Sequence, residues 1–582
     1  MEKESDKSAR RKSFLYETEI GRFLAAGVII AILMLIIYRI FPVQFETNDD
    51  SSMMNILSGR QTGNPEVGTI YSNIVRDYGI SFLYKIFPGF SWYTITTILL
   101  LYFANVIILK TIFRIFVSKG WTLWKGTLFY LVFYFLCIHY SIVFIQFTTL
   151  AGILGAAAIA LITGTYLNES KAIRIIDGIL AILLIFVSYI TRPLAGKVVL
   201  VCSIFAMLIK LFCSTKKSWK QKGILYSTIF MSAIILIAGA SAIHQKYYGA
   251  AEWKAYREYN AQRAQFCDYP RLSYEEGRSI YEKAGWSEEL YELVNGWFFM
   301  DKAVTKENFQ IINEAYVAEQ NSLKNQIISG IITLQQFLIS NKLAFYTFFG
   351  SVVCLLGITA IVCVKKERRH LLWIFSGMLL GGGLLFYLSF KGRILIRVYL
   401  LCLVPLLCLL VLQMLLMCSK NCKIEKRIIL GVLCICGIFA FANIKEVNKK
   451  MQDPLLVKEI QEKAVLDEYC ASHPDNLYIY ALSVVSSRYS PWENENRNTT
   501  LNYFSWGGAT MFSPIYYERL EANGLSELYA DKFFEDNVYF VNNDNAILNS
   551  LINYLSKTYD CTVKYEIVEK VADCSVIKFS CE

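Results

Sequence analysis

Two adjacent acidic residues, Asp49 and Asp50, closely follow the first long apolar run of the chain. A carboxylate buried near lipid without a partner is costly, so an acidic pair at this place suggests a function. A carboxylate within hydrogen-bond reach of a substrate hydroxyl can take its proton as the oxygen attacks. The structural alternative is that Asn48, Asp49 or Asp50 caps a helix over 51–58, which Gly59 would end. A cap accounts for one acid and leaves the second unexplained.

Four basic residues are predicted to lie at the same membrane depth as this pair. Arg192 ends the fifth apolar run before a proline that breaks the helix, and Lys391, Arg393 and Arg397 lie between the ninth and tenth runs. Arginine can hold a lipid phosphate by bidentate pairing, and lysine can bind it as a point charge. The alternative is that these side chains extend to anionic headgroups or pair with a loop acid. Two cationic groups beside an acidic pair favour phosphate binding.

Apolar runs of about 20 residues must position these groups. The 582 residues are 55% apolar and only 18% charged, against about 25% charged in soluble chains. Runs of this length can cross a bilayer core of about 30 Å. We predict an α-helical polytopic membrane protein with eleven spans, of which the third has the least distinct end. They are 21–41, 91–117, 125–140, 147–168, 174–190, 194–213, 223–243, 343–364, 371–389, 396–418 and 428–444.

Clusters of lysine and arginine predict the orientation. They precede the first span and follow the second, fourth, sixth, eighth and tenth, which places them all on one side. By the positive-inside rule that side is the cytoplasm. We therefore expect a multi-pass cell-membrane protein with a cytoplasmic N-terminus. Residues 1–444 form the multi-span domain with outer loops 43–90 and 244–342, and residues 445–582 form an extracytoplasmic domain.

Several function classes are disfavoured. The net charge of +10 comes mostly from the orienting loops, so it does not indicate nucleic-acid binding. The predicted cytoplasmic loops are too short for a nucleotide site, and no G-x-x-x-x-G-K-[ST] motif occurs. The four histidines are far apart, no Cys-x-x-Cys occurs, and no cofactor or metal is indicated. Chemistry is thus expected on the outer face, where a transferred sugar would need a lipid-linked donor.

The layout resembles the GT-C superfamily of membrane glycosyltransferases, in which an acidic pair follows the first span. It also looks like an uncharacterised group of multi-span proteins of Gram-positive bacteria. The residues that carry this likeness are Asn48, Asp49, Asp50, Ile56, Leu57, Ser58, Gly59, Asn64, Pro65, Tyr84, Phe87, Pro88, Trp92 and Tyr93. The resemblance implies a polyprenyl-phosphate sugar as donor, with Asp49 or Asp50 as base and Arg192, Lys391, Arg393 and Arg397 near the donor phosphate. Many relatives have Asp-Glu where this chain has Asp-Asp, so the choice of base stays open.

The outer segments have weaker patterns. An interfacial helix is predicted to end at Pro88, and one long helix is predicted over 305–328. The C-terminal domain is expected to be a small α/β unit, with strands over 476–485 and 537–541, a helix over 548–556 and a hairpin of 563–568 with 575–579. Residues 503–508 are expected to form a loop. Cys561 and Cys581 lie at the ends of the hairpin and are expected to be free.

The predicted function is transfer of a sugar from a polyprenyl-phosphate donor to a cell-surface glycan or a lipid-linked acceptor, with membrane lipids as surroundings. Direct displacement would make it an inverting enzyme with a single base. A transporter or flippase of lipid-linked glycans is one alternative, although no internal repeat is visible. A glycan polymerase is another, and it would need no acid after the first span.

Overall fold

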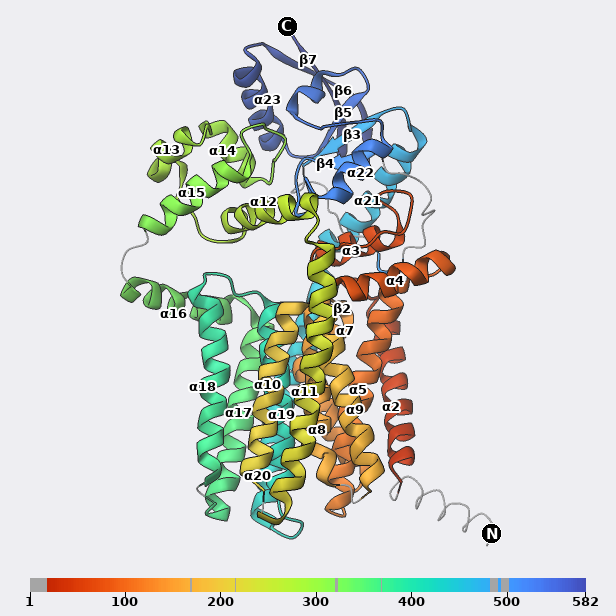
Figure 1. The fold of residues 1–582 in the computed structure, drawn as a ribbon, viewed down its shortest axis with the longest axis vertical. Coiled ribbons are helices and arrows are strands. Elements are labelled where there is room, and N and C mark those ends of the chain that lie inside the picture. Colours follow the sequence, from red (N-terminus) through yellow and green to blue (C-terminus); the bar gives the residue numbers. More distant parts are fainter. Residues whose placement is uncertain are drawn as a thin grey trace.

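Eleven helices in the described residues are long and apolar enough to cross a membrane, as predicted. The computed structural model describes residues 18–167, 170–214, 216–319, 323–367, 369–481, 490–492 and 502–582. The spans run side by side, with the C-terminal sheet beyond one end of the bundle and the start of the first span at the other (Figure 1). We call the end that carries the sheet the domain end. The predicted multi-span architecture with a small α/β C-terminal domain is confirmed.

The spans have the following bounds: α2 (Glu19–Ile40), α5 (Trp92–Ser118), α6 (Leu123–Phe133) continued by η1 (Tyr134–Ile138) and α7 (His139–Val143), α8 (Phe147–Gly164), α9 (Lys171–Thr191), α10 (Pro193–Phe212), α11 (Lys216–Tyr247), α17 (Lys342–Lys365), α18 (Arg369–Phe390), α19 (Ile396–Met417) and α20 (Lys423–Met451). All residues of α8 are buried, and this helix contacts α5, α9, α10 and α19. Small side chains allow this close packing, because a Cβ at Gly152 would lie 3.0 Å from the Cα of Leu401.

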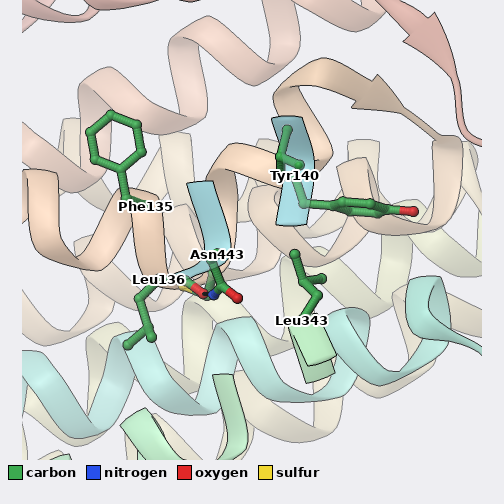
Figure 2. Close-up of a pocket in the computed structure, with 7 residues that line it drawn as sticks. Phe135, Leu136, Tyr140, Leu343 and Asn443 are labelled. Atoms are coloured by element: carbon green, nitrogen blue, oxygen red, sulfur yellow. Dashed lines mark hydrogen bonds between the residues drawn. The ribbon is translucent and has the colours of Figure 1, made fainter. Parts of the chain in front are cut away.

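The third span loses its α-helical form near the domain end, where its predicted end was the least distinct of the eleven. A π-helical turn, η1, connects α6 to α7, and strand β2 (Phe144–Ile145) then pairs in parallel with β1 (Gln44–Phe45). The turn leaves the Leu136 carbonyl available, and it accepts hydrogen bonds from Asn443 Nδ2 at 2.6 Å and Thr347 Oγ1 at 3.2 Å. Figure 2 shows Asn443 at this turn, beside a small pocket that Tyr140 also borders. Two neighbouring spans therefore stabilise the irregular turn that positions Tyr140.

Replacing Asn443 with leucine is expected to lower the thermal midpoint of the detergent-purified protein. The Leu136 carbonyl would lose its shorter hydrogen bond inside the bundle and keep only the bond from Thr347, a cost of about 1–2 kcal/mol. The matched control is Asn448→Leu, because Asn448 is exposed on the same helix. Equal midpoints for the two variants would contradict a stabilising role for the Asn443 contact.

The segments between spans form short helices at the domain end. These are α3 (Asn48–Ser58), α4 (Ile74–Ile86), α12 (Ala251–Asp268), α13 (Tyr274–Lys283), α14 (Glu288–Asn295), α15 (Lys306–Glu319) and α16 (Leu323–Ser340). The structural alternative, a helix cap at Asn48, Asp49 or Asp50, does not occur, because α3 starts at Asn48 and Thr47 is its N-cap residue. Gly59 ends α3 in the left-handed conformation, as predicted. The range 305–328, predicted as one helix, contains α15 and the start of α16, and residues 320–322 between them lie outside the described residues.

The C-terminal domain begins with α21 (Pro454–Ser472) and contains a five-stranded sheet in the order β4-β3-β5-β7-β6. The first three strands in this order are parallel, and β5, β7 and β6 are antiparallel. The remaining elements are β3 (Leu477–Tyr480), β4 (Tyr503–Ser505), α22 (Pro514–Ala522), η3 (Ala530–Phe534), β5 (Val538–Asn542), α23 (Asn545–Tyr559), β6 (Val563–Val571) and β7 (Cys574–Cys581). The mixed α/β unit is as predicted, while residues 482–485 of the predicted first strand lie outside the described residues.

Two details of this domain correct the sequence prediction. Cys561 and Cys581 form a disulfide. The strand register pairs Val563 with Cys581, and this brings the Cα atoms of the two cysteines to 5.9 Å. The loop predicted over 503–508 starts with strand β4. This strand pairs with β3, which lies far away in sequence, so its extended form depends on a partner that local periodicity does not reveal.

Buried contacts join the outer segments into one body. Helices α13, α14 and α15 share a hydrophobic core with the C-terminal sheet, and the Phe299 N–H donates to the Trp506 carbonyl at 2.9 Å. The loop after α3 is fixed through Arg60, whose guanidinium lies 2.6 Å from the Asp467 carboxylate on α21. Lys463 also pairs with Asp467 and donates to the Tyr503 hydroxyl at 2.6 Å. The first outer segment is thereby attached to the last domain of the chain.

Candidate active site

The two acids on the first turn of α3 have different surroundings. Asp50 is 1% exposed, and its Oδ1 accepts hydrogen bonds from the Tyr93 hydroxyl at 2.7 Å and the Phe147 N–H at 3.1 Å. Its Oδ2 has no hydrogen-bond partner among the described residues. The Asp49 side chain is 24% exposed, and its Oδ2 lies 3.8 Å from Arg397 Nη2. Asp50 therefore belongs to the protein interior, whereas Asp49 faces the charged groups of the site.

Burial raises the pKa of Asp50 to about 8. The hydrogen bonds from Tyr93 and Phe147 lower this pKa and the charge of Asp49 raises it, but loss of solvation dominates. Asp50 is therefore largely protonated at pH 7. A neutral carboxylic acid accepts the two hydrogen bonds on one oxygen without placing a second negative charge beside Asp49.

The raised pKa of Asp50 predicts a pH-dependent stability. Between the ordinary carboxyl pKa near 4 and the folded-state value of about 8, the folded protein binds more protons than the unfolded chain. Stability contributed by this group is therefore present at low pH and is lost as the pH rises through about 8. Asp50→Asn removes the titration. The thermal midpoint of this variant, relative to that of the wild type, should therefore increase from pH 5 to pH 8. Parallel midpoint profiles for the two proteins would contradict this assignment.

The four basic residues predicted from the sequence border one cavity of about 1080 Å³ at the domain end of the spans. Arg192 donates to the Thr148 hydroxyl and stacks over the Phe147 ring at 5.0 Å. Burial and the nearby charge of Arg397 lower the pKa of Arg192 to about 10, so it remains a cation at neutral pH. Apolar side chains of α10, α18 and α19 line the rest of the cavity toward the bundle. The cavity thus combines a cationic part with an apolar part.

The cavity cations differ in whether a carboxylate lies close to them. Arg393 Nη1 lies 2.9 Å from Asp268 Oδ2, at the end of α12. Gly392 allows this contact, since its φ of +71° suits glycine and a Cβ there would come within 2.9 Å of Pro270. Among the described residues, Arg192 and Lys391 form no ion pair within 4.0 Å. In the described part of the chain, these two cavity cations have no carboxylate within 4.0 Å.

Sequence reasoning missed three residues of the site. Glu46 is buried, and its carboxylate lies 3.5 Å from Arg397 Nη1 and accepts from the Tyr140 hydroxyl at 3.3 Å. Tyr140 in turn accepts from Lys450 Nζ at 2.7 Å. Arg397 therefore lies between the carboxylates of Glu46 and Asp49. Two of these residues had a signal in the sequence. Glu46 lies in the same short stretch as the acidic pair, and Lys450 is a cation beyond the last predicted apolar run.

No group of three or more His, Cys, Asp or Glu side chains suited to a metal ion occurs within the described part of the chain. The groups that could take part in a reaction include the partly exposed carboxylate of Asp49, the buried neutral acid Asp50 and the four cavity cations. Together they can bind an anion and accept a proton close to it.

Fold and site define a polytopic membrane protein with a charged, partly apolar cavity at the level where the spans end. No protein-family model matches the chain, and no curated protein matches it. Among solved structures, the chain is similar to that of ArnT from Cupriavidus metallidurans bound to undecaprenyl phosphate. The two sequences are 9% identical, the alignment covers 95% of this chain and 97% of that chain, and the TM-score is 0.36.

Proposed function

We propose that this protein is a membrane glycosyltransferase of the GT-C type. It moves a sugar from a polyprenyl-phosphate donor to a surface glycan or a lipid-linked acceptor, with the domain end on the extracytoplasmic side of the cell membrane. The observation that carries the proposal is the cavity of about 1080 Å³, in which four cations meet apolar span surfaces. A lipid phosphate needs both parts, because its head is anionic and its tail is apolar.

In the proposed reaction, an acceptor hydroxyl attacks the anomeric carbon of the donor sugar. The bond from this carbon to the phosphate oxygen breaks, the electron pair leaves with the phosphate, and Asp49 takes the hydroxyl proton. Arg192 and Lys391 stabilise the charge that grows on the departing phosphate. A single displacement inverts the anomeric configuration. Asp49 is the base in this scheme because Asp50 is buried and protonated at neutral pH.

Glu46 and Asp50 are positioning residues in this scheme. Glu46 holds Arg397 at Nη1 while Asp49 lies near Nη2, so that the guanidinium stays at the cavity wall. Asp50 ties the first turn of α3 to the start of α5 through Tyr93 and to α8 through the Phe147 N–H. Both contacts fix the position of Asp49 relative to the spans.

Binding of undecaprenyl phosphate is the direct test. We expect it to raise the thermal midpoint of the full chain in detergent, whereas undecaprenol, which lacks the phosphate, should raise it much less. Arg192→Gln should weaken phosphate-dependent binding by about tenfold or more, since a charged hydrogen bond to the ligand contributes about 1.5–3 kcal/mol. Arg39→Gln is the matched control, because Arg39 is an exposed arginine near the domain end of α2.

Two results would contradict the proposed donor class. One is equal stabilisation by undecaprenol and undecaprenyl phosphate. The other is equal displacement of the ligand by phosphatidylglycerol, which would identify the cavity as a general site for anionic lipids. Unchanged binding by Arg192→Gln would remove this arginine from the proposed phosphate site.

A further inference from the structure

Helix α16 (Leu323–Ser340) has three distinct faces. At about 100° per residue, Gly330, Leu334 and Phe337 fall on one face, and Asn325, Ser329 and Gln336 fall on a second. A third face carries four isoleucines, Ile328, Ile331, Ile332 and Ile339, with Lys324 and Gln335 among them. Lys324 is the one charged residue of the helix. A helix with a single charged residue and four isoleucines opposite the face that packs on the spans is unusual for a segment surrounded by water.

The first face holds α16 against the spans. Gly330 is buried, and a Cβ at this position would come within 3.0 Å of the Cα of Phe390 at the end of α18. Leu334 and Phe337 pack on the core of the bundle, where the Phe337 ring lies 5.6 Å from that of Tyr399. The helix is therefore a fixed part of the fold.

The second face forms part of the cavity wall. Asn325, Gln326 and Ser329 line the cavity together with Lys391 and Arg397. All three side chains are polar and uncharged. The same helix thus meets the cationic cavity on one side and presents its isoleucines on another.

The isoleucine face is uncovered, with its four side chains between 46% and 66% exposed. Helix α16 lies across the domain ends of α17 and α18 and projects sideways beyond α18 (Figure 1). The neighbouring span α18 also exposes large apolar side chains, including Leu379 and Tyr387. An exposed apolar patch of this kind at the level where spans end fits the boundary between lipid headgroups and acyl chains.

We propose that α16 lies in the lipid leaflet at the domain end, with its isoleucine face in the acyl chains, and forms the wall between the bilayer and the cavity. The occupant of this face is the bilayer itself. A molecule that reaches the cavity from the lipid must then pass along α16. The proposal depends on the contacts of this helix and holds whether or not the protein transfers a sugar.

Photo-crosslinking of the full chain in phosphatidylcholine nanodiscs tests it. Ile331→p-benzoylphenylalanine and, in a second protein, Ile328→p-benzoylphenylalanine should give lipid adducts on illumination, detected by the mass of the labelled peptide. Gln336→p-benzoylphenylalanine is the matched control on the polar face and should give few or none. Leu379→p-benzoylphenylalanine on α18 is the positive control for lipid contact.

Two outcomes would overturn the proposal. One is adduct formation at Leu379 together with lipid labelling at Ile331 and Ile328 no greater than at Gln336. The other is crosslinking of Ile331 to a second copy of the chain, which would identify the isoleucine face as a subunit interface. Neither readout uses transfer activity, so failure here is distinguishable from failure of the proposed reaction.

Discussion

Asp49→Asn is expected to reduce sugar transfer by about 10²–10⁴-fold, the usual contribution of a positioned general base. The amide has the same shape as the carboxylate but cannot accept the acceptor's proton. Donor binding should persist, because Arg192 and Lys391 are unchanged. The measurement is release of polyprenyl phosphate from a labelled polyprenyl-phosphate sugar by the full chain in liposomes, with surface glycan composition compared at equal protein level in cells.

Asp50→Asn is the control for this substitution. The asparagine oxygen can still accept from Tyr93 and Phe147, and a group that is already neutral loses no charge on replacement. This variant should therefore transfer at a rate closer to wild type than Asp49→Asn does. A greater loss of transfer with Asp50→Asn than with Asp49→Asn would show that Asp50 is the base and Asp49 the positioning residue. Full transfer by both variants would refute the transferase proposal, and movement of labelled lipid across the bilayer without release of its sugar would favour a flippase.

Arg397→Gln is expected to lower kcat/KM by about 10²–10³-fold, comparable to loss of one transition-state donor. Arg397 contacts both Glu46 and Asp49, so its loss removes a cation from the cavity and the restraint on Asp49. It also leaves the buried Glu46 carboxylate without its cation, which should lower the thermal midpoint. Activity is measured by polyprenyl-phosphate release and stability by thermal unfolding.

The double variant Glu46→Gln with Arg397→Gln separates these two effects. Removing both members of a buried pair restores neutrality, so the midpoint should recover toward wild type while transfer stays low. Arg393→Gln is the matched single control, because Arg393 borders the same cavity but pairs with Asp268 on α12. Recovery of transfer in the double variant would show that Arg397 acts only on stability.

The spans could be predicted because their signal is local. A run of apolar residues identifies each span, and the clustered lysines and arginines order the loops, as between α19 and α20, whose loop contains Lys420. The π-helical turn at Tyr134–Ile138 could not be predicted, since it depends on Asn443 and Thr347 donating from distant spans. A regular apolar sequence contains no sign of such partners.

The candidate site could be predicted in part for the same reason. Arg192 and Arg397 are recognisable as cations that the predicted orientation places on the outer side, and the two acids are recognisable by their place after a span. Glu46 has only a weak signal in the sequence, its place in the same short stretch, because its role comes from its contact with Arg397. The unequal burial of Asp49 and Asp50 also depends on tertiary contacts, since both occupy the same helical turn.

The ion pair between Arg60 and Asp467 has a consequence for the order of assembly in the cell. Arg60 leaves the ribosome early, with the first outer segment, whereas Asp467 belongs to the part of the chain that is made last. Lys450, which contacts Tyr140, lies at the end of α20 and is translated with the last of the spans. The membrane helices can insert one after another during synthesis, but the surroundings of Asp49 cannot become complete until translation is nearly finished. A chain released before α21 would be inserted in the membrane without a finished site.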